Sequence, residues 1–188
     1  MKWQFQRQAG FTVTELMVVT AIVAILLGLG VPSFRYITNS YRMSAEVNGL
    51  LGDLMYARAE AIREGQTVTV CISNNGTSCA GAGGNWANGW IVFSDPNNNK
   101  IVDAGETVLR TQAAFTGAVR DTFNASGNLN AITYNREGFA TTAAGFPNTT
   151  ITLHDQTSSA NWTRCLWITP VGTLTIETPS NNLSGTCS

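Results

Sequence analysis

The chain has 188 residues, which suits one domain of ordinary size and is short for two. Its 11 basic and 12 acidic side chains give a formal net charge of -1. Two of the basic residues, Lys2 and Arg7, precede the first apolar run, which leaves 9 basic against 12 acidic residues in the remainder. This balance argues against a domain built to bind a polyanion.

An uncharged run covers residues 16–34 near the start of the chain. At about 1.5 Å per residue, a helix of this length spans the roughly 30 Å hydrocarbon core of a bilayer. The basic residues before it place the N-terminus in the cytoplasm and the rest of the chain outside. A cleaved secretory signal is the competing interpretation, but the run is long for one and lacks a small-x-small cleavage site. We therefore expect residues 11–34 to form a transmembrane helix.

A carboxylate, Glu15, stands at the leading edge of this run, where an unpaired charge in lipid is costly. Gly10, Phe11 and Glu15 resemble the type IV prepilin signature, in which a short basic leader ends in Gly, Phe follows, and Glu is the fifth mature residue. The resemblance implies that a prepilin peptidase removes residues 1–10 and that the new N-terminus on Phe11 is methylated. Glu15 would then neutralise that amine, in the same or a neighbouring subunit, and help set the register of assembly. The alternative is that Glu15 merely lies among the lipid headgroups.

Apolar residues continue at intervals of three and four, which predicts an amphipathic helix over 35–64 with Gly65 as its C-cap. With the preceding run, this predicts one helix over 11–64. Three residues would bend or loosen it at the outer edge of the membrane: Gly28, Gly30 and Pro32. Small residues would help such helices to pack in lipid: Ala21, Ala24, Gly28 and Gly30.

From about residue 66 the composition changes to Thr, Asn, Gly, Ser and Ala with scattered aromatics, which is typical of short strands joined by turns. Strands are predicted at 67–72, 90–94, 107–111, 131–135, 150–153, 165–169 and 173–176. The simplest architecture is an α+β fold, in which a long N-terminal helix packs on an antiparallel sheet. The globular domain would then cover residues 35–188, with a helix at 35–64 and a β-rich part at 66–188.

Several stretches, at 54–63, 67–71, 89–95 and 103–110, resemble the GspH/FimT group of minor pilins and pseudopilins. The resemblance implies the type IV pilin fold and a non-enzymatic subunit in the bacterial inner membrane, with its C-terminal domain in the periplasm, before it enters a filament. The implied partners are prepilin peptidase and other pilins or pseudopilins. The disulfide-bearing C-terminal half favours a minor pilin of a type IV pilus tip or initiation complex. The alternatives are the H pseudopilin of type II secretion and a FimT-like, DNA-binding pilin for natural transformation.

The DNA-binding alternative meets a direct obstacle in the C-terminal region. In FimT proteins DNA binding is attributed to a Gly-Arg-x-Arg motif, and the matching place here reads Gly172-Thr-Leu-Thr175. The arginines that would contact phosphate are absent. The remaining arginines of this region, Arg120, Arg136 and Arg164, are isolated in sequence. Nucleic acid is therefore not an expected partner.

All four cysteines follow the membrane segment: Cys71, Cys79, Cys165 and Cys187. An even count without a CxxC pair favours disulfides over zinc, as in periplasmic domains. Nearest-neighbour pairing would join the first two and the last two cysteines, which is one of three possible connectivities. Crosswise pairing would instead tie the early strands to the C-terminal tail.

The loop at 95–106 places oxygen-bearing side chains where a calcium-loop template needs them. However, Lys100 occupies the position where the template needs Gly for a sharp turn, and the flanks are predicted strands. We therefore favour a polar hairpin loop and expect neither a metal nor a cofactor. The candidate calcium ligands are Asp95, Asn97, Asn99, Asp103, Glu106 and the carbonyl of Ile101.

The sequence gives little support for an enzyme. His154 is the only histidine, and no Gly-x-Ser-x-Gly nucleophile motif occurs. We expect His154 to lie on the surface at a strand end. Four tryptophans are expected in the core or at an interface rather than in a ligand-binding patch: Trp86, Trp90, Trp162 and Trp167.

Overall fold

The structure, a computed structural model, describes residues 10–81, 84–115, 121–142, 145 and 148–187. The chain divides into two compact units, one up to Ser40 and one from Tyr41 onward. Helix α1 (Val13–Glu64) passes from the first unit into the second, and the helix predicted at 11–64 therefore starts two residues later than expected. α1 is not interrupted at Gly28, Gly30 or Pro32. Proline removes one N–H donor, and the helical assignment persists in the turns on either side.

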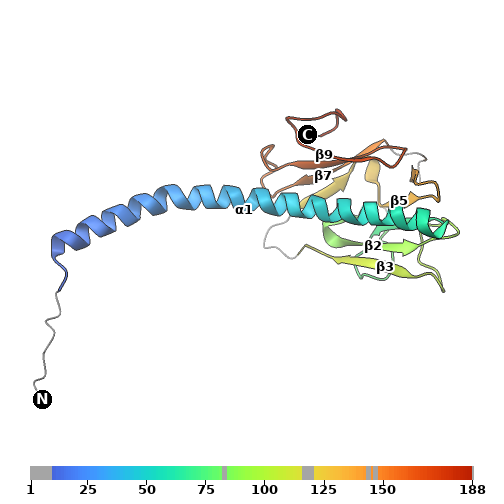
Figure 1. Cartoon of the computed structure of the whole chain (residues 1–188), viewed down its shortest axis with the longest axis horizontal. Helices are drawn as coiled ribbons and strands as arrows, with labels where there is room; N and C mark the ends of the chain where they lie inside the picture. Colours follow the sequence, from blue (N-terminus) through green and yellow to red (C-terminus); the bar gives the residue numbers. More distant parts are fainter. Residues whose placement is uncertain (1–9, 82–83, 116–120, 143–144, 146–147, 188) are drawn as a thin grey trace, which may run out of the picture. The chain divides into compact units, whose positions relative to one another are not determined.

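The second unit contains nine strands, all of whose pairings are antiparallel, within the described residues. In chain order they are β1 (Val68–Ile72), β2 (Gly89–Ser94), β3 (Val108–Ala113), β4 (Thr122–Ala125), β5 (Ala131–Tyr134), β6 (Ala140–Thr141), β7 (Thr149–His154), β8 (Arg164–Ile168) and β9 (Leu174–Glu177). Two short 3-10 turns, Trp86–Asn88 and Ser126–Asn128, precede β2 and β5. Figure 1 shows the strands beside the C-terminal half of α1.

The strands form two sheets rather than the single sheet that the sequence suggested. Sheet A has the order β3-β2-β1-β5-β6, and sheet B has the order β4-β7-β8-β9. All seven predicted strands are present with ends shifted by one or two residues, whereas β4 and β6 were not predicted. β4 supplies sheet B with an edge strand, so the chain leaves sheet A after β3 and returns to it at β5.

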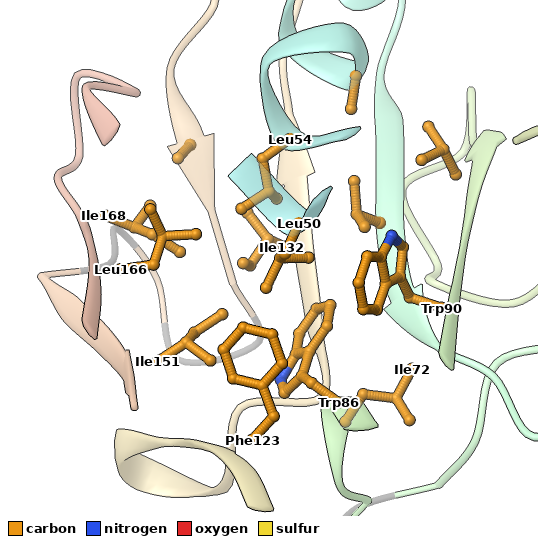
Figure 2. Packing of buried hydrophobic residues seen from close by; sticks show 14 of the residues in the cluster. Leu50, Leu54, Ile72, Trp86, Trp90, Phe123, Ile132, Ile151, Leu166 and Ile168 are labelled. Carbon is orange, nitrogen blue, oxygen red and sulfur yellow. The ribbon is translucent and has the colours of Figure 1, made fainter. Parts of the chain in front are cut away.

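The main core lies between α1 and the inner faces of both sheets. One stripe of α1, spaced three and four residues apart, is almost fully buried, and burying one leucine side chain is worth about 1.5–3 kcal/mol. Leu50 and Leu54 lie among side chains of both sheets (Figure 2). The helical stripe consists of Met43, Val47, Leu50, Leu54, Ala57 and Ala61. The sheets contribute, among others, Ile72, Trp90, Phe123, Ile132, Ile151, Leu166 and Ile168, and the 3-10 turn before β2 contributes Trp86.

Sheet A also carries a smaller apolar cluster on its other face. Side chains alternate along a strand, so Val70 of β1 faces α1 while Cys71 belongs to the outer cluster. Ile91, Phe93 and Ala131 complete the buried part of this outer cluster. Two connections cover it, because Cys79 and Val102 pack on it from the loops after β1 and β2.

Asp53 ties sheet A to α1 by polar contacts. Its Oδ2 accepts a hydrogen bond from Nε1 of Trp90 on β2 at 2.8 Å, and its Oδ1 pairs with Nη1 of Arg110 on β3 at 3.0 Å. The Arg110 guanidinium also lies 3.8 Å from the ring centroid of Tyr56 on α1. One carboxylate therefore satisfies a buried indole and positions the edge strand β3.

Arg58 makes the corresponding tie to sheet B. Its guanidinium donates to the carbonyls of Val171 and Gly172 in the β8–β9 turn, at 3.0 and 2.9 Å. Gly172 has φ 75°, and a Cβ there would clash with the carbonyl oxygen of Gly138. Only glycine therefore fits at position 172, where the β8–β9 turn lies against the backbone of Gly138 and the side chain of Arg58.

Replacement of Asp53 by alanine should destabilise the fold. The Asp53→Ala chain leaves the Trp90 indole N–H without its acceptor and Arg110 without its partner, so we expect a loss of about 2 kcal/mol in the free energy of unfolding. Denaturant unfolding of the full chain in detergent measures this loss. Glu137→Ala is the matched control, because the Glu137 carboxylate pairs with the neighbouring exposed Arg136, and it should leave stability unchanged. Equal stability of the Asp53→Ala and wild-type chains would contradict this role.

Two glycine variants distinguish the cost of placing alanine at a positive φ from the cost of a clash between its Cβ and a neighbouring backbone atom. Gly172 and Gly185 both have positive φ, but a Cβ at Gly185 would meet no atom within 4 Å. We expect Gly185→Ala to cost about 1 kcal/mol and Gly172→Ala about 3 kcal/mol or more in unfolding free energy. The same denaturation experiment measures both. Equal losses would show that contact with Gly138 is unimportant.

Candidate functional site

The first turn of α1 is built by Thr12, which lies directly before Val13. Its Oγ1 accepts a hydrogen bond from the backbone N–H of Glu15 at 3.2 Å, and its carbonyl accepts from the N–H of Leu16 at 3.1 Å. Thr12 is therefore the N-cap of the helix. The sequence Thr12-Val-Thr-Glu15 matches the Ser/Thr-x-x-Glu pattern of helix starts, a signal that could have located this residue.

Glu15 occupies a position where a helix favours negative charge. It lies in the first turn of α1, close to the positive end of the helix dipole. Its side chain is exposed, and no ion pair involves it within the described part of the chain. Phe11 is 80% exposed, and Gly10 precedes the helix in exposed, irregular backbone. Both sides of the predicted cleavage bond are thus accessible.

The described part of the first unit presents apolar side chains to its surroundings along most of its helix. Among the described residues, α1 is the helix whose length and composition would let it cross a membrane, and none of its apolar window is buried within the chain. At Gly28 and Gly30 an added Cβ would meet no atom within 4 Å. The large exposed residues of this surface are Val13, Leu16, Met17, Val18, Val19, Ile22, Val23, Ile25, Leu26, Leu27, Leu29 and Val31.

The loop between β2 and β3 begins with a fully buried carboxylate, Asp95. It accepts hydrogen bonds from Thr69 Oγ1 at 2.6 Å and from the backbone N–H groups of Asn99 and Lys100 at 3.0 and 3.1 Å. These bonds fix a sharp turn in which Lys100 itself adopts φ 62°. The left-handed conformation that a calcium loop assigns to Gly is therefore made by a lysine, supported by Asp95.

The other oxygens of this loop also have partners inside it. Asp103 Oδ2 accepts from the side-chain amides of Asn97 and Asn99 at 2.9 and 2.7 Å, and these bonds hold the pKa of Asp103 below its usual value. Glu106 accepts from the backbone N–H of Asp103 at 2.9 Å, and the Asn99 side chain accepts from that of Ile101 at 2.8 Å. No group of three or more His, Cys, Asp or Glu side chains suited to a metal ion occurs in the described ranges. The geometry is that of a polar hairpin loop.

Two disulfides close the loops on the sheets. Cys71 of β1 is bonded to Cys79, and Cys165 of β8 is bonded to Cys187 in the C-terminal tail. The tail has a second attachment at Glu177 of β9, whose carboxylate accepts from the backbone N–H of Ser184 at 3.0 Å and from its hydroxyl at 2.7 Å. The early bridge covers the outer face of sheet A, and the late bridge fastens the tail to sheet B.

The four tryptophans named above and His154 have separate surroundings in the structure. Trp86 and Trp90 are fully buried, which confirms the prediction that they belong to the core, and Trp162 packs against that core. Trp167 donates from Nε1 to Asn148 Oδ1 at 2.8 Å. His154, at the end of β7, makes a 3.1 Å contact from Nδ1 to Thr163 Oγ1.

The region matched to the DNA-binding motif is occupied by structural contacts. The backbone of Gly172 lies close to the carbonyl oxygen of Gly138 and to the side chain of Arg58. Arg136 pairs with Glu137 at 2.7 Å, and Arg164 donates to the carbonyls of Asn161 and Thr163. Arg120 lies outside the described residues. The described arginines of this region therefore serve local contacts.

Comparisons with known proteins place this geometry among pilin-like proteins. Residues 46–172 match the family model described as Type II transport protein GspH, and residues 5–31 match the Prokaryotic N-terminal methylation motif. The pilin-like protein PilA1 of Thermus thermophilus is 31% identical over 97 residues, covering 52% of this chain and 54% of PilA1. The chain thus matches about half the length of this curated relative.

Two solved structures were found by comparison of the fold. The type IV minor pilin FimU of Pseudomonas aeruginosa superposes with a TM-score of 0.56 at 18% identity, over 78% of this chain and 94% of FimU. The minor pseudopilin EpsH of the Vibrio cholerae type 2 secretion system gives a TM-score of 0.46 at 12% identity, over 72% and 96%. The first likeness confirms the predicted type IV pilin fold. Because the GspH model matches about two thirds of the residues, the chain belongs to the GspH family and carries the N-terminal methylation motif.

Proposed function

We propose that this chain is a minor pilin of a type IV pilus tip or initiation complex, made as a prepilin and assembled through the first part of α1. The observation that carries the proposal is the unburied apolar window of the first unit, on a helix that has Glu15 in its first turn. The match of residues 5–31 to the methylation motif supports the same reading. The protein would wait in the bacterial inner membrane, with its second unit in the periplasm, before joining a filament.

The exposed surface needs a non-aqueous environment. A contiguous apolar surface on a soluble monomer rarely exceeds a few hundred Å², whereas this one extends along the whole described apolar window. A helix satisfies its own backbone in lipid, so the membrane can hold it before assembly. Neighbouring helices can replace the lipid afterwards, with close approach at Gly28 and Gly30, where the surface is open.

The processing step fits the geometry at the start of the helix. The bond between Gly10 and Phe11 lies before the first turn of α1, in exposed and irregular backbone. Peptidases bind such segments more readily than hydrogen-bonded helix. Cleavage there would leave Thr12 in place as the N-cap, so the helix would keep its first turn after the leader is removed.

Glu15 would match the amine that cleavage creates. Within the chain its carboxylate is exposed, so a group on a second molecule can reach it. In a water-poor environment an unpaired charge is expensive, and a charge pair across subunits therefore selects one register over others. The helix dipole adds a preference for negative charge at the same end.

A second candidate is the H-type pseudopilin of a type II secretion system, which the description of the family model favours. The two candidates share processing and helix assembly and differ in the machine they join. Deletion of the gene would distinguish them, since loss of surface pili with normal secretion supports the minor pilin and loss of secretion alone supports the pseudopilin. DNA binding has no comparable support, because Gly172 to Thr175 lack the arginines of the motif.

Gly10→Val should block processing. A branched side chain at the cleavage bond excludes the close backbone approach that glycine allows. Mass spectrometry of the membrane fraction should then find the chain beginning at Met1, while the wild-type chain begins at methylated Phe11. Gln8→Ala serves as the control within the leader and should be processed normally. A mature wild-type chain that still begins at Met1 in cells with an active prepilin peptidase would refute this processing.

Glu15→Gln should impair assembly without impairing insertion or processing. The amide keeps the size of the side chain and removes the charge that would pair with the amine of Phe11. We expect at least about a tenfold drop of the subunit in the sheared filament fraction, with unchanged amounts in the membrane. Glu64→Gln, at the other end of α1, should assemble like the wild type. Incorporation of Glu15→Gln at wild-type levels would exclude this role for the carboxylate.

A further inference from the structure

A cluster of charged side chains holds the first packed turns of α1 within the second unit. Arg42 of α1 forms an ion pair with Asp121: Nη2 donates a hydrogen bond to Oδ1 at 3.2 Å, and Nε lies 3.1 Å from Oδ2 without hydrogen-bond geometry. Asp121 directly precedes β4 and is only 8% exposed. The contact joins residues 79 positions apart, immediately beside the core residue Met43. It anchors the start of the packed part of α1 to the edge of sheet B.

Two further carboxyl groups belong to the same cluster. Asp155 follows β7 and is 4% exposed, and the pairing of Thr122 with His154 brings the ends of β4 and β7 together. Glu46 lies one turn after Arg42 on α1. Its Oε2 is buried and has no hydrogen-bond partner among the described residues. Among the described residues, Asp121 contacts the Arg42 guanidinium directly, and the charge of Arg42 also acts on Glu46 and Asp155. Arg120, the residue before Asp121, lies outside the described residues.

The carboxyl groups of this cluster differ in their hydrogen-bond and ion-pair partners. Asp155 accepts from the Ser159 N–H at 3.0 Å and from Thr157 Oγ1 at 2.6 Å; burial acts to raise its pKa, but these bonds together lower it below its usual value. Burial raises the pKa of Asp121, although Arg42 opposes this and Asp155 adds to it. The nearby His154 ring contacts Thr163 instead.

Of the three carboxyl groups, Glu46 is the one whose ionised form is destabilised most by its surroundings. Burial, followed by the negative charge of Asp121, raises the pKa of Glu46 to about 7, and the attraction of Arg42 only partly offsets this. At a pH below neutral the Glu46 side chain is therefore protonated and neutral, and Arg42 keeps its ion pair with Asp121. Above neutral pH, Glu46 adds a second negative charge that repels the charge of Asp121, and both carboxylates are attracted to the Arg42 guanidinium.

We propose that Arg42, Glu46, Asp121 and Asp155 form a proton-sensitive clamp, which grips the first packed turns of α1 against β4 when Glu46 carries a proton and loosens when it is ionised. The clamp acts on residues 41–47 and on the start of β4. It is independent of the machine that the subunit joins.

The direction of the pH effect follows from the two states of Glu46. Its ordinary value is 4.5, so between about pH 4.5 and 7 the unfolded chain ionises while the folded chain keeps the proton. Stability therefore falls as the pH rises through this window and does not fall further above it. Below pH 4.5 Glu46 is neutral in both states and contributes no pH dependence.

Hydrogen exchange of the full chain in detergent tests the clamp, read at residues 41–50 and 121–125 and corrected for intrinsic exchange rates. We expect protection in the wild-type chain to fall about fivefold between about pH 5.5 and 8, because a partly exposed charge shifts local stability modestly. Glu46→Gln mimics the protonated state and should stay protected at both pH values. Glu137→Gln, whose carboxylate pairs with the exposed Arg136, should behave like the wild type.

Two outcomes would overturn the proposal: the same pH dependence in Glu46→Gln as in the wild type, or loss of protection in Glu46→Gln at both pH values. Direct NMR titration of the Glu46 carboxyl carbon in the wild-type chain gives a second test that requires no variant. A midpoint near neutral pH supports the clamp, and a midpoint near the ordinary value of 4.5 refutes it.

Discussion

The second unit depends on the burial of one stripe of α1 between two sheets. The stripe faces sheet A and sheet B together, so its side chains must be nearly free of polar groups. The polar ties lie beside the stripe: Asp53 holds sheet A, while Arg58 and Arg42 hold sheet B. Each tie pairs a side-chain group of α1 with a partner on a sheet or its turns, although Nε of Arg42 and Nε of Arg58 have no hydrogen-bond partner among the described residues. Apolar burial supplies the driving force, and the ties select the positions of the strands.

The first unit has the opposite character, and its function follows from the contrast. Among the described residues no element covers its apolar window, and the polar side chains at the start of its helix are Thr12, Thr14 and Glu15. A helix that is apolar on all sides is stable when it is surrounded by lipid or packed among other such helices. The capped first turn adds an electrostatic preference for negative charge at the end through which we propose that the subunit assembles. The GspH family membership and the methylation motif agree with this division of labour.

Much of this architecture was accessible from the sequence, because its signals are local. Periodicity located α1, and alternation with turn residues located seven of the nine strands described. β4 and β6 escaped because Thr-Phe-Asn-Ala and Ala-Thr are too short to show a pattern. The split into two sheets also escaped, since strand order depends on pairings between distant segments. The link between Arg42 and Asp121 joins distant segments in the same way, whereas Thr12 could have been found from its local motif.

We propose that the apolar surface of α1 in the first unit contacts other pilin-like subunits after processing. A photo-activatable amino acid placed at Leu27 in living cells tests this contact directly, with exposed Thr111 on β3 as the comparison position. The account predicts cross-links from position 27 to other subunits carrying the N-terminal methylation motif, and their loss in cells without prepilin peptidase. Cross-links to lipid alone, or protein cross-links that persist without the peptidase, would contradict it.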